Sequence, residues 1–380
     1  MRKPVILFLL RFHSLKRGSF EESLIYRAEK LKSEFKLVYV FAKFPPSWLY
    51  KSLREFDASV DHLDLKTNLR SLFLLNKLLH KYKPKIIHFH FFSLLTPFIP
   101  YIKFKYKIKV IFHIHAIISY DKGSNFLSSR LIPFRKYIAV RTIDLAIAVS
   151  KFVRQRTLEH FSFPHPKIVT IYNGIKNNSK KEKIKKFQII DSVENSRFLI
   201  VAGGWLTNIK GIDILLKSIP LVKNNTIKDI IVFIVGDGPE RNNLKNLCSE
   251  LELEKNIEFL GWRNDVHNIL ALADLVVIPS VVEEAFCYFL LEAMRTGKAV
   301  IASNIGAIPE LVDSKQKSGL LFPPGDIKKL AECIMFLLNN PILRKKYGHF
   351  GMQKSIKYFN INSQILKLKH NYQNFLKNRV

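Results

Sequence analysis

The chain alternates short apolar runs with longer runs of helix-forming residues, and this alternation constrains the fold more than any other feature. A strand followed by a helix and then another strand favours a parallel sheet with helices on both faces. We therefore expect an α/β fold of the doubly wound, Rossmann-like type. The strand-like runs are Val5–Leu10, Lys36–Phe41, Ile86–His90, Val110–His115 and Leu145–Val149, and the helix-like runs are Phe20–Lys32 and Leu69–Lys81.

Length and composition indicate two globular domains. A chain of 380 residues is long for one hydrophobic core and sufficient for two. Hydrophobic residues make up 48% and charged residues 24%, which excludes disorder as a description of the whole chain. The lysine-rich segment from Lys176 to Lys186 contains no core pattern, so we expect the interdomain linker there. This division predicts an N-terminal domain at 1–180 and a C-terminal domain at 187–351.

Positive charge is concentrated in the N-terminal half. Residues 1–180 contain 33 Lys and Arg against 11 Asp and Glu, and they account for +22 of the formal net charge of +30. Such an excess indicates an anionic partner: a membrane surface, a nucleic acid or a phosphorylated substrate. Because no helix-turn-helix, zinc or aromatic stacking signature accompanies the charge, a nucleic-acid-binding protein is only a remote alternative, and we expect no nucleic-acid partner.

The compartment is predicted from the cysteines and the apolar runs. Cys248, Cys287 and Cys333 show neither metal nor disulfide spacing, as expected in a reducing cytoplasm. The N-terminal apolar run stops at Arg11 and fits a buried first strand, and the apolar region from Phe89 to Ile102 falls short of a membrane span. We therefore predict a cytoplasmic protein.

Two glutamates, Glu284 and Glu292, are the central candidates for ligand binding. A strand is predicted to end near Pro279, and good helix formers follow from Phe289 to Met294. Eight positions at helical rise cover about 12 Å. A nucleoside ribose and a sugar joined by a pyrophosphate are separated by a similar distance, so one carboxylate can hold each end of a nucleotide-sugar. The alternative is a pair of solvated acids near a helix start.

Glycine turns before helices mark two further candidate sites. Gly203 and Gly204 end a strand-like run, and Lys210 follows shortly before the next helix. Strand, glycine pair, lysine and helix is a phosphate-binding order, because backbone N–H groups and the helix dipole face the anion. The alternative for the lysine is a solvated position at a helix start. Gly18 and Ser19 form a similar turn after the first strand, at the edge of the sheet where ligands bind.

Two His-x-His pairs lie in predicted strands of the N-terminal half. The members of each pair, His88 with His90 and His113 with His115, share one face of the sheet. Imidazoles bind transition metals, but the chain has no Asp-x-Asp motif and no carboxylate near these pairs. We therefore interpret them as core or cleft-lining residues and expect no metal site and no cofactor.

The order of these motifs resembles that of glycosyltransferase family 4, the group 1 glycosyltransferases. The resemblance rests on the Glu-x7-Glu pair with the flanking segments 276–280, 297–302 and 306–310, and it is densest over 198–348. It implies the GT-B fold, in which two Rossmann-like domains face each other across a cleft. It also implies a terminal helix, at 352–380, that returns to the N-terminal domain, and retaining, metal-independent transfer of a sugar from a nucleotide-diphosphate sugar to an acceptor.

The resemblance also implies roles for individual residues. Glu292 would hold the ribose hydroxyls, Glu284 the sugar and Lys210 the phosphates, while His115 would contact the sugar from the facing domain and the acceptor would lie on the side of Gly18 and Ser19. This chain has Trp205 where the family has arginine after glycine. The expected donor site comprises Gly203, Gly204, Lys210, Glu284, Ala285, Phe286, Cys287 and Glu292, with Ala285 and Cys287 standing where the family prefers glycine.

The acceptor is expected to be lipid-linked or a cell-surface glycan, with the protein peripheral on the inner face of the cell membrane. Lys103, Lys105, Lys107 and Lys109 alternate with apolar side chains, so an extended segment would place all four ammonium groups on one side against an anionic surface. The alternative is a solvated approach to the next strand. The alternative function is a sugar-nucleotide epimerase on the same fold, which needs no acceptor.

Overall fold

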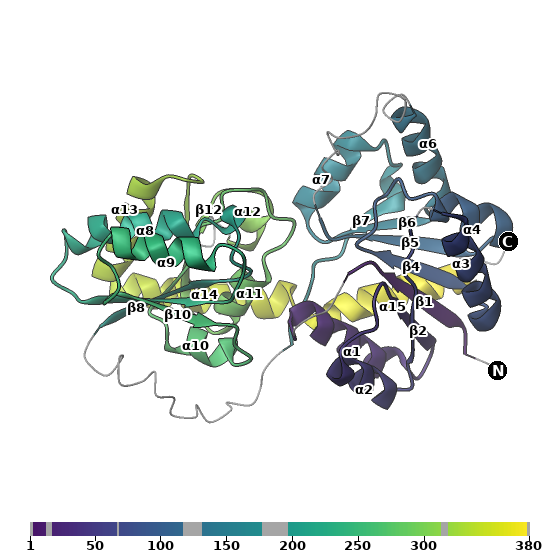
Figure 1. Cartoon of the computed structure of the whole chain (residues 1–380), viewed down its shortest axis with the longest axis horizontal. Coiled ribbons are helices and arrows are strands. Elements are labelled where there is room, and N and C mark those ends of the chain that lie inside the picture. Colours follow the sequence, from purple (N-terminus) through teal and green to yellow (C-terminus); the bar gives the residue numbers. More distant parts are fainter. Residues whose placement is uncertain are drawn as a thin grey trace. The chain divides into compact units, whose positions relative to one another are not determined.

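The computed structural model describes residues 3–12, 17–66, 68–116, 131–176, 197–312 and 318–377. The chain divides into two compact units, each with its own parallel sheet and core (Figure 1). Unit 1 comprises Met1–Gly174 with Ile361–Val380, and unit 2 comprises Ile175–Asn360. The predicted α/β class is confirmed in both units. The predicted linker lies, apart from Lys176, outside the described residues.

Unit 1 contains a seven-stranded parallel sheet in the order β3-β2-β1-β4-β5-β6-β7. The order reverses between β1 and β4, which pair directly from Ile6 with Ile86 to Leu10 with His90. Such a reversal leaves a crevice at the carboxyl ends of the two strands. The strands are β1 (Val5–Leu10), β2 (Lys36–Phe41), β3 (Ser59–His62), β4 (Ile86–His90), β5 (Lys109–Ile114), β6 (Leu145–Ala148) and β7 (Ile168–Thr170).

The helices of unit 1 cover this sheet, and α4 differs from the sequence-based expectation. A common face of the four lysines requires the segment Tyr101–Lys109 to be extended, but α4 continues to Tyr106 and Lys107 turns in the left-handed region (φ 52°). Phe98, Ile99 and Ile102 are buried, and this helical spacing overrides the alternation of the lysines. The helices are α1 (Ser19–Leu31), α2 (Ser47–Glu55), α3 (Leu69–Tyr82), α4 (Phe98–Tyr106), α6 (Ile132–Thr142), α7 (Lys151–His160) and η1 (His165–Lys167).

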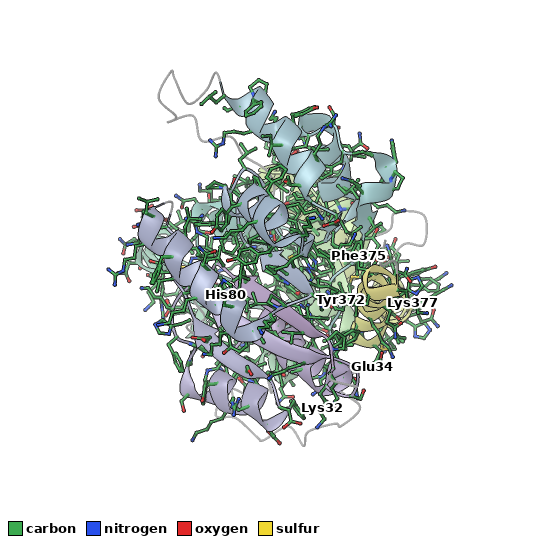
Figure 2. The ribbon with its side chains drawn as sticks, turned by 90° about the vertical axis from the view of Figure 1, so that its right-hand side faces the viewer. Lys32, Glu34, His80, Tyr372, Phe375 and Lys377 are labelled. Carbon is green, nitrogen blue, oxygen red and sulfur yellow. The ribbon has the colours of Figure 1, made fainter. Side chains whose placement is uncertain are left out.

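The final helix, α15 (Ile361–Lys377), completes the core of unit 1 (Figure 2). Its Tyr372 is fully buried, and the Tyr372 hydroxyl lies 2.8 Å from Nδ1 of His88 on β4. The return was expected from residue 352, but α14 (Pro341–Tyr358) continues through that position within unit 2. Gly351 and Ser355 of α14 are buried in unit 2, so the helix that returns to unit 1 begins only at Ile361.

Unit 2 contains a six-stranded parallel sheet in the order β10-β9-β8-β11-β12-β13, which reverses between β8 and β11. Its strands are β8 (Phe198–Gly203), β9 (Ile230–Val235), β10 (Ile257–Gly261), β11 (Leu275–Ile278), β12 (Ala299–Ser303) and β13 (Leu320–Phe322). Its helices, besides α14, are η3 (Asn208–Lys210), α8 (Ile212–Lys223), α9 (Arg241–Glu250), α10 (Val266–Leu272), α11 (Tyr288–Arg295), α12 (Ile308–Leu311) and α13 (Ile327–Asn339).

Across the described ranges, every helix is too short or too polar to cross a bilayer.

Two glycines of α14 provide a matched test of packing in unit 2. A Cβ at Gly348 would lie 2.0 Å from the Gly297 carbonyl oxygen, whereas at Gly351 the nearest atom would be 3.4 Å away. We expect Gly348→Ala to destabilise unit 2 by about 1–3 kcal/mol, because backbone must shift. Gly351→Ala should be neutral or stabilising by up to about 1 kcal/mol, because alanine favours helix. Urea unfolding followed by Trp205 and Trp262 in a Trp48→Phe background measures both; equal effects would contradict the prediction.

Candidate functional site

The loops after β8 and β11 meet at the carboxyl edge of unit 2, where the strand order reverses. Lys210 at the end of the first loop and Glu284 in the second form an ion pair, with Nζ 2.9 Å from Oε2. Only 22% and 10% of these two side chains are exposed. The buried Ser280 hydroxyl donates a hydrogen bond to Oε1 of Glu284. The carboxylate is therefore held from both sides.

Close backbone contacts fix the loop after β11 to the loops after β8 and β12. A Cβ at Gly211 would lie 2.0 Å from the Pro279 carbonyl oxygen, and one at Gly306 would lie 2.5 Å from the Glu284 nitrogen. Both glycines also have positive φ, 62° and 60°, where side chains are strained. The Ala307 N–H donates to the Glu284 carbonyl at 2.9 Å. The position of Glu284 therefore depends on two residues, Ser280 and Gly306, that the sequence-based site did not include.

The other predicted donor residues surround this pair. Gly204 has a positive φ of 128°, and a Cβ there would lie 3.8 Å from Cε of Lys210. Gly203 packs against the backbone of Val235, because a Cβ at Gly203 would lie 2.1 Å from the Val235 carbonyl oxygen. Ala285 and Phe286 lie in the loop, and the buried Cys287 precedes the first residue of α11. Glu292 is half-buried on α11.

The spacing argument for the two glutamates needs correction. Helix α11 begins at Tyr288, so Glu284 lies in a loop and only the second half of the interval to Glu292 is helical. The estimate of about 12 Å from helical rise therefore does not apply to the whole interval. The loop conformation instead follows from the contact of Glu284 with Gly306 and Ala307.

The electrostatics of the site centre on one ammonium group. Burial would lower the pKa of Lys210, but the ion pair with Glu284 outweighs burial and raises that pKa above its usual value. Burial, with Glu284 nearby, raises the pKa of the Cys287 thiol to about 12. At neutral pH the site therefore holds a charged ammonium beside an uncharged thiol. A diphosphate entering the site would compete with Glu284 for Lys210, because both offer anionic oxygens to the same donor.

Trp205, which stands where the family has arginine, is 55% exposed. Its indole offers a flat surface and one N–H donor but no charge. Among the residues chosen from the sequence for the donor site, Lys210 is therefore the cation that the structure places beside Glu284.

The four histidines of the two His-x-His pairs form one cluster in unit 1, because β4 and β5 pair with His90 opposite His113. His90 Nδ1 lies 2.8 Å from His115 Nε2, and the Arg27 guanidinium lies 3.4 Å from His90 Nε2. Burial and the nearby Arg27 charge lower the pKa of His115 to about 3. Burial, together with neighbouring rings and Arg27, also holds the pKa values of the other three well below the usual range. The cluster is therefore neutral at physiological pH.

The spacing of this cluster raises the question of a metal ion. One nitrogen each from His88, His90 and His113 can be chosen so that all three lie within 4.8 Å of one another. His88 Nε2 and both nitrogens of His113 are buried without a hydrogen-bond partner in the described part of the chain. The buried Arg27, however, already contributes a positive charge at His90, and this opposes a second cation. The residues fit a metal poorly, and the expectation of no metal site stays a prediction.

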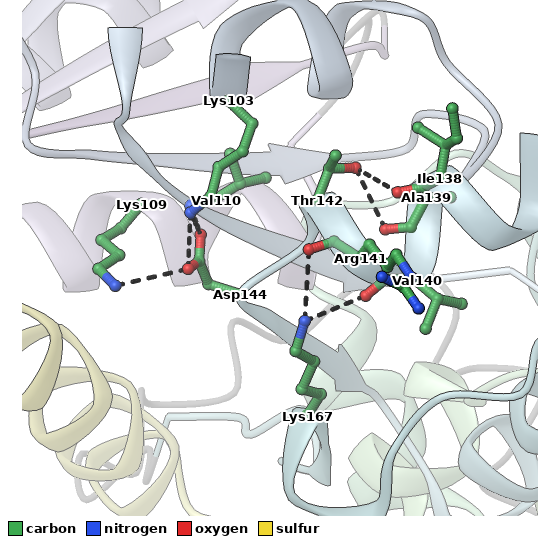
Figure 3. A network of polar contacts seen from close by, with 10 residues as sticks. All are labelled: Lys103, Lys109, Val110, Ile138, Ala139, Val140, Arg141, Thr142, Asp144 and Lys167. Atoms are coloured by element: carbon green, nitrogen blue, oxygen red, sulfur yellow. Dashed lines mark hydrogen bonds and ion pairs between the residues drawn. The ribbon is translucent and has the colours of Figure 1, made fainter.

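The four lysines expected to form a membrane face do not act together. Figure 3 shows Lys103 and Lys109 beside Asp144. Lys103 and Lys109 both turn to Asp144, at 2.6 and 3.5 Å, and Asp144 also accepts from the Val110 N–H at 2.8 Å. Lys105 instead donates to the Tyr101 hydroxyl. The predicted common face of Lys103, Lys105, Lys107 and Lys109 is therefore wrong, because helix α4 and Asp144 separate them.

Gly18 and Ser19 lie at the start of α1, as expected from the sequence. Gly18 is extended (φ −141°), and a Cβ there would lie 3.0 Å from a carboxylate oxygen of Glu21. Arg17 pairs with Glu22 in the same turn. Acidic groups already occupy the first turn of this helix, so it is a weaker anion site than its glycine suggests.

Comparisons with known proteins agree with this architecture. Residues 182–354 match the family described as Glycosyl transferases group 1, and residues 31–178 match Glycosyltransferase Family 4. An uncharacterized glycosyltransferase of Methanocaldococcus jannaschii is 31% identical over 203 residues, 51% of each chain. The UDP-Gal:alpha-D-GlcNAc-diphosphoundecaprenol alpha-1,3-galactosyltransferase of Escherichia coli is 33% identical over 160 residues, 42% of this chain and 41% of its own. The chain spans about half the length of the curated relatives it matches.

Solved structures resemble the whole chain. A glycosyltransferase of Rickettsia africae has a TM-score of 0.82 at 23% identity and is covered in full, as is this chain. The Anabaena protein HepE in complex with UDP has a TM-score of 0.78 at 20% identity, with 98% of this chain and 100% of that chain covered. The fold therefore defines a two-domain α/β protein of the GT-B type.

Both matched segments come from the same kind of enzyme, and together they account for most of the chain. The chain belongs to glycosyltransferase family 4, the group 1 glycosyltransferases.

The histidine cluster predicts that unit 1 is destabilised by acid. Because the buried histidines have lowered pKa values in the folded state, the unfolded chain binds more protons below about pH 6.5. The full contribution of the neutral histidines to the free energy of unfolding is therefore present above that pH. Below it, this free energy falls by about 1.4 kcal/mol per pH unit for each buried histidine. His113→Phe should reduce this slope.

Urea unfolding between pH 7.5 and 5.0 measures the slope, with Trp48 reporting unit 1 when Trp205 and Trp262 are replaced by Phe. His80→Gln is the control, because it removes an exposed histidine of unit 1. An unchanged slope in His113→Phe would contradict the prediction.

Proposed function

We propose that this protein transfers a sugar from a nucleotide-diphosphate sugar to an acceptor. The observation that carries the proposal is the half-buried ion pair of Lys210 and Glu284 at the strand reversal of unit 2. This edge of a doubly wound sheet is where nucleotides bind. Structures with the same fold have been solved with UDP and with UDP-glucose, both for HepE of Anabaena. These complexes support a nucleotide-sugar donor for this chain.

In the proposed complex, Lys210 releases Glu284 and binds the diphosphate. Glu284 is then available to the hydroxyls of the sugar, and Glu292 on α11 binds the ribose. As the sugar bond breaks, negative charge develops on the diphosphate leaving group, and a buried ammonium stabilises that charge more strongly than a solvated one. We propose retaining transfer without a metal ion, because Lys210 supplies the charge that a divalent cation supplies in other transferases.

The proposed acceptor is a lipid-linked glycan at the inner face of the membrane. The Escherichia coli relative is named for an acceptor on diphosphoundecaprenol. The N-terminal half carries most of the positive charge, and α3, α4 and α6 of unit 1 carry large exposed apolar side chains, among them Phe73, Phe104 and Phe134. Basic and aromatic side chains together favour an anionic membrane surface. Polysaccharide biosynthesis is the process that such a transfer serves.

The two glutamates should have separable effects. Glu292→Gln should weaken binding of both the free nucleoside diphosphate and the donor, by about ten-fold, because the ribose is present in both. Glu284→Gln should reduce turnover more than it weakens nucleoside diphosphate binding, because the sugar is present only in the donor. Glu283→Gln is a neighbouring control. Calorimetric titration with UDP, GDP, ADP and CDP, followed by turnover with the sugar of the base that binds, separates the two effects. Equal loss of nucleotide affinity in both variants would contradict these roles.

Metal independence predicts that a chelator leaves activity intact. Turnover in excess EDTA should equal that of the untreated enzyme, whereas Lys210→Gln should lower turnover by about a hundred-fold or more, because the leaving group then lacks its charge. Activity is measured by release of nucleoside diphosphate with and without added Mg²⁺. Complete loss in EDTA that Mg²⁺ restores would contradict the mechanism.

Membrane binding should depend on exposed residues of α4 and on Lys107, which follows it, rather than on all four lysines. The triple variant Phe104→Ser, Lys105→Glu and Lys107→Glu should bind anionic vesicles at least about ten-fold more weakly at low salt, because it removes apolar and basic contacts together. The control variant Ile227→Ser and Lys245→Glu changes exposed residues of unit 2. Co-sedimentation with vesicles containing phosphatidylglycerol measures binding; equal binding of the wild type and the triple variant would reject this contact.

A further inference from the structure

A cavity of about 370 Å³ lies at the strand reversal of unit 1. Arg11 follows β1 directly, and its N–H donates to the carbonyl of His90, the last residue of β4. Phe92 and Ser93 continue from β4, and Thr96 leads into α4. The cavity therefore occupies the place in unit 1 that the Lys210 site occupies in unit 2, at the edge where doubly wound sheets bind ligands.

Two arginines, Arg11 and Arg135, line this cavity, and its charge is not neutralised within the described part of the chain. Arg135 donates to the Leu95 carbonyl at 2.9 Å, and Arg11 lies over the Phe92 ring at 6.0 Å. Within the described ranges, neither guanidinium has a carboxylate at ion-pair distance. Helix α4 begins at the cavity with no side chain capping its first turn. Two guanidinium groups and uncapped N–H donors form the chemistry that binds phosphate.

A second cavity, of about 460 Å³, adjoins the first and shares Pro97 and Phe98 with it. Its lining is mainly apolar and comes from the starts of α3 and α4: Asn68, Leu69, Leu72, Pro97, Phe98 and Tyr101. Leu69 is 84% exposed at its mouth, so the cavity opens toward solvent along an apolar side chain. An apolar groove of this kind accepts a hydrocarbon chain.

We propose that the two cavities together bind a phosphorylated lipid, with the phosphate between Arg11 and Arg135 and the start of its hydrocarbon chain against Leu69 and Leu72. This inference rests on the proposed function, for which it supplies the acceptor site. A free phosphate would leave the apolar cavity unused, and a neutral lipid would leave two guanidinium groups without a counter-charge. An anionic lipid satisfies both cavities at once, so the charge complementarity selects it.

The test uses dodecyl phosphate below its critical micelle concentration, with dodecyl maltoside and inorganic phosphate as the neutral-lipid and headgroup-only probes. Calorimetric titration of the full chain should give dodecyl phosphate an affinity at least about ten-fold higher than either control probe. Arg11→Gln, Arg135→Gln and Leu69→Asp should each weaken dodecyl phosphate binding by about ten-fold. Lys51→Gln, an exposed change on α2 of the same unit, should have no effect.

Equal affinity for dodecyl maltoside would overturn the proposal in favour of a neutral apolar site. Equal affinity for inorganic phosphate would overturn it in favour of a free-anion site. Unchanged binding of dodecyl phosphate in both arginine variants would also overturn it. Titration of the same samples with the nucleoside diphosphates tests the proposed function separately, because that site lies in unit 2. Failure of every nucleotide to bind would reject the proposed donor, whereas nucleotide binding without dodecyl phosphate binding would reject only the acceptor site.

Discussion

The ion pair between Lys210 and Glu284 is the interaction on which the candidate site of unit 2 depends. Moving two charges out of water costs more than their attraction returns unless further hydrogen bonds hold them. Here Ser280 bonds the second carboxylate oxygen, and the backbone of Glu284 is fixed by contacts with Gly306 and Ala307. The pair therefore keeps the ammonium charged, oriented and largely buried without a ligand. In the proposed function, an incoming diphosphate would replace Glu284 as the partner of Lys210, and it would not have to order a mobile lysine side chain.

The two units share one construction but differ in the charge at the strand reversal. Unit 2 places Lys210 and Glu284 in contact there, so these two charges balance each other. Unit 1 places Arg11 and Arg135 around a cavity at the equivalent edge, and the described chain supplies no acid to pair with them. The first arrangement suits a ligand that brings both hydroxyls and phosphates, because both partners of the pair can be used. The second suits a ligand that brings negative charge alone.

The regular elements could be predicted closely, because strands buried on both faces are continuous apolar runs. The observed β1, β2 and β4 have the expected bounds, β5 begins and ends one residue earlier than expected, and β6 ends one residue earlier. Lys210 and Glu284 were both chosen from the sequence, but their contact was not, because it joins residues 74 positions apart. It requires the pairing of β8 with β11, and no local pattern encodes that neighbourhood. The prediction from the lysines at 103–109 failed for a different reason. Their alternation with apolar residues suggested a strand, but the buried residues of this segment follow the period of a helix.

The histidines of β4 are placed by a local strand pattern, but their environment depends on a helix distant in the sequence. Strand periodicity predicted that His88 and His90 share a face, but that face is covered by α15, from the far end of the chain. The Tyr372 hydroxyl is the only hydrogen-bond partner of the His88 side chain in the described part of the chain, and its neighbours on α15 bury apolar surface against the same core. Residues before Gly174 therefore contain the whole sheet of unit 1 but not its whole core. Because α15 closes that core, unit 1 completes its folding only after unit 2 has been synthesised.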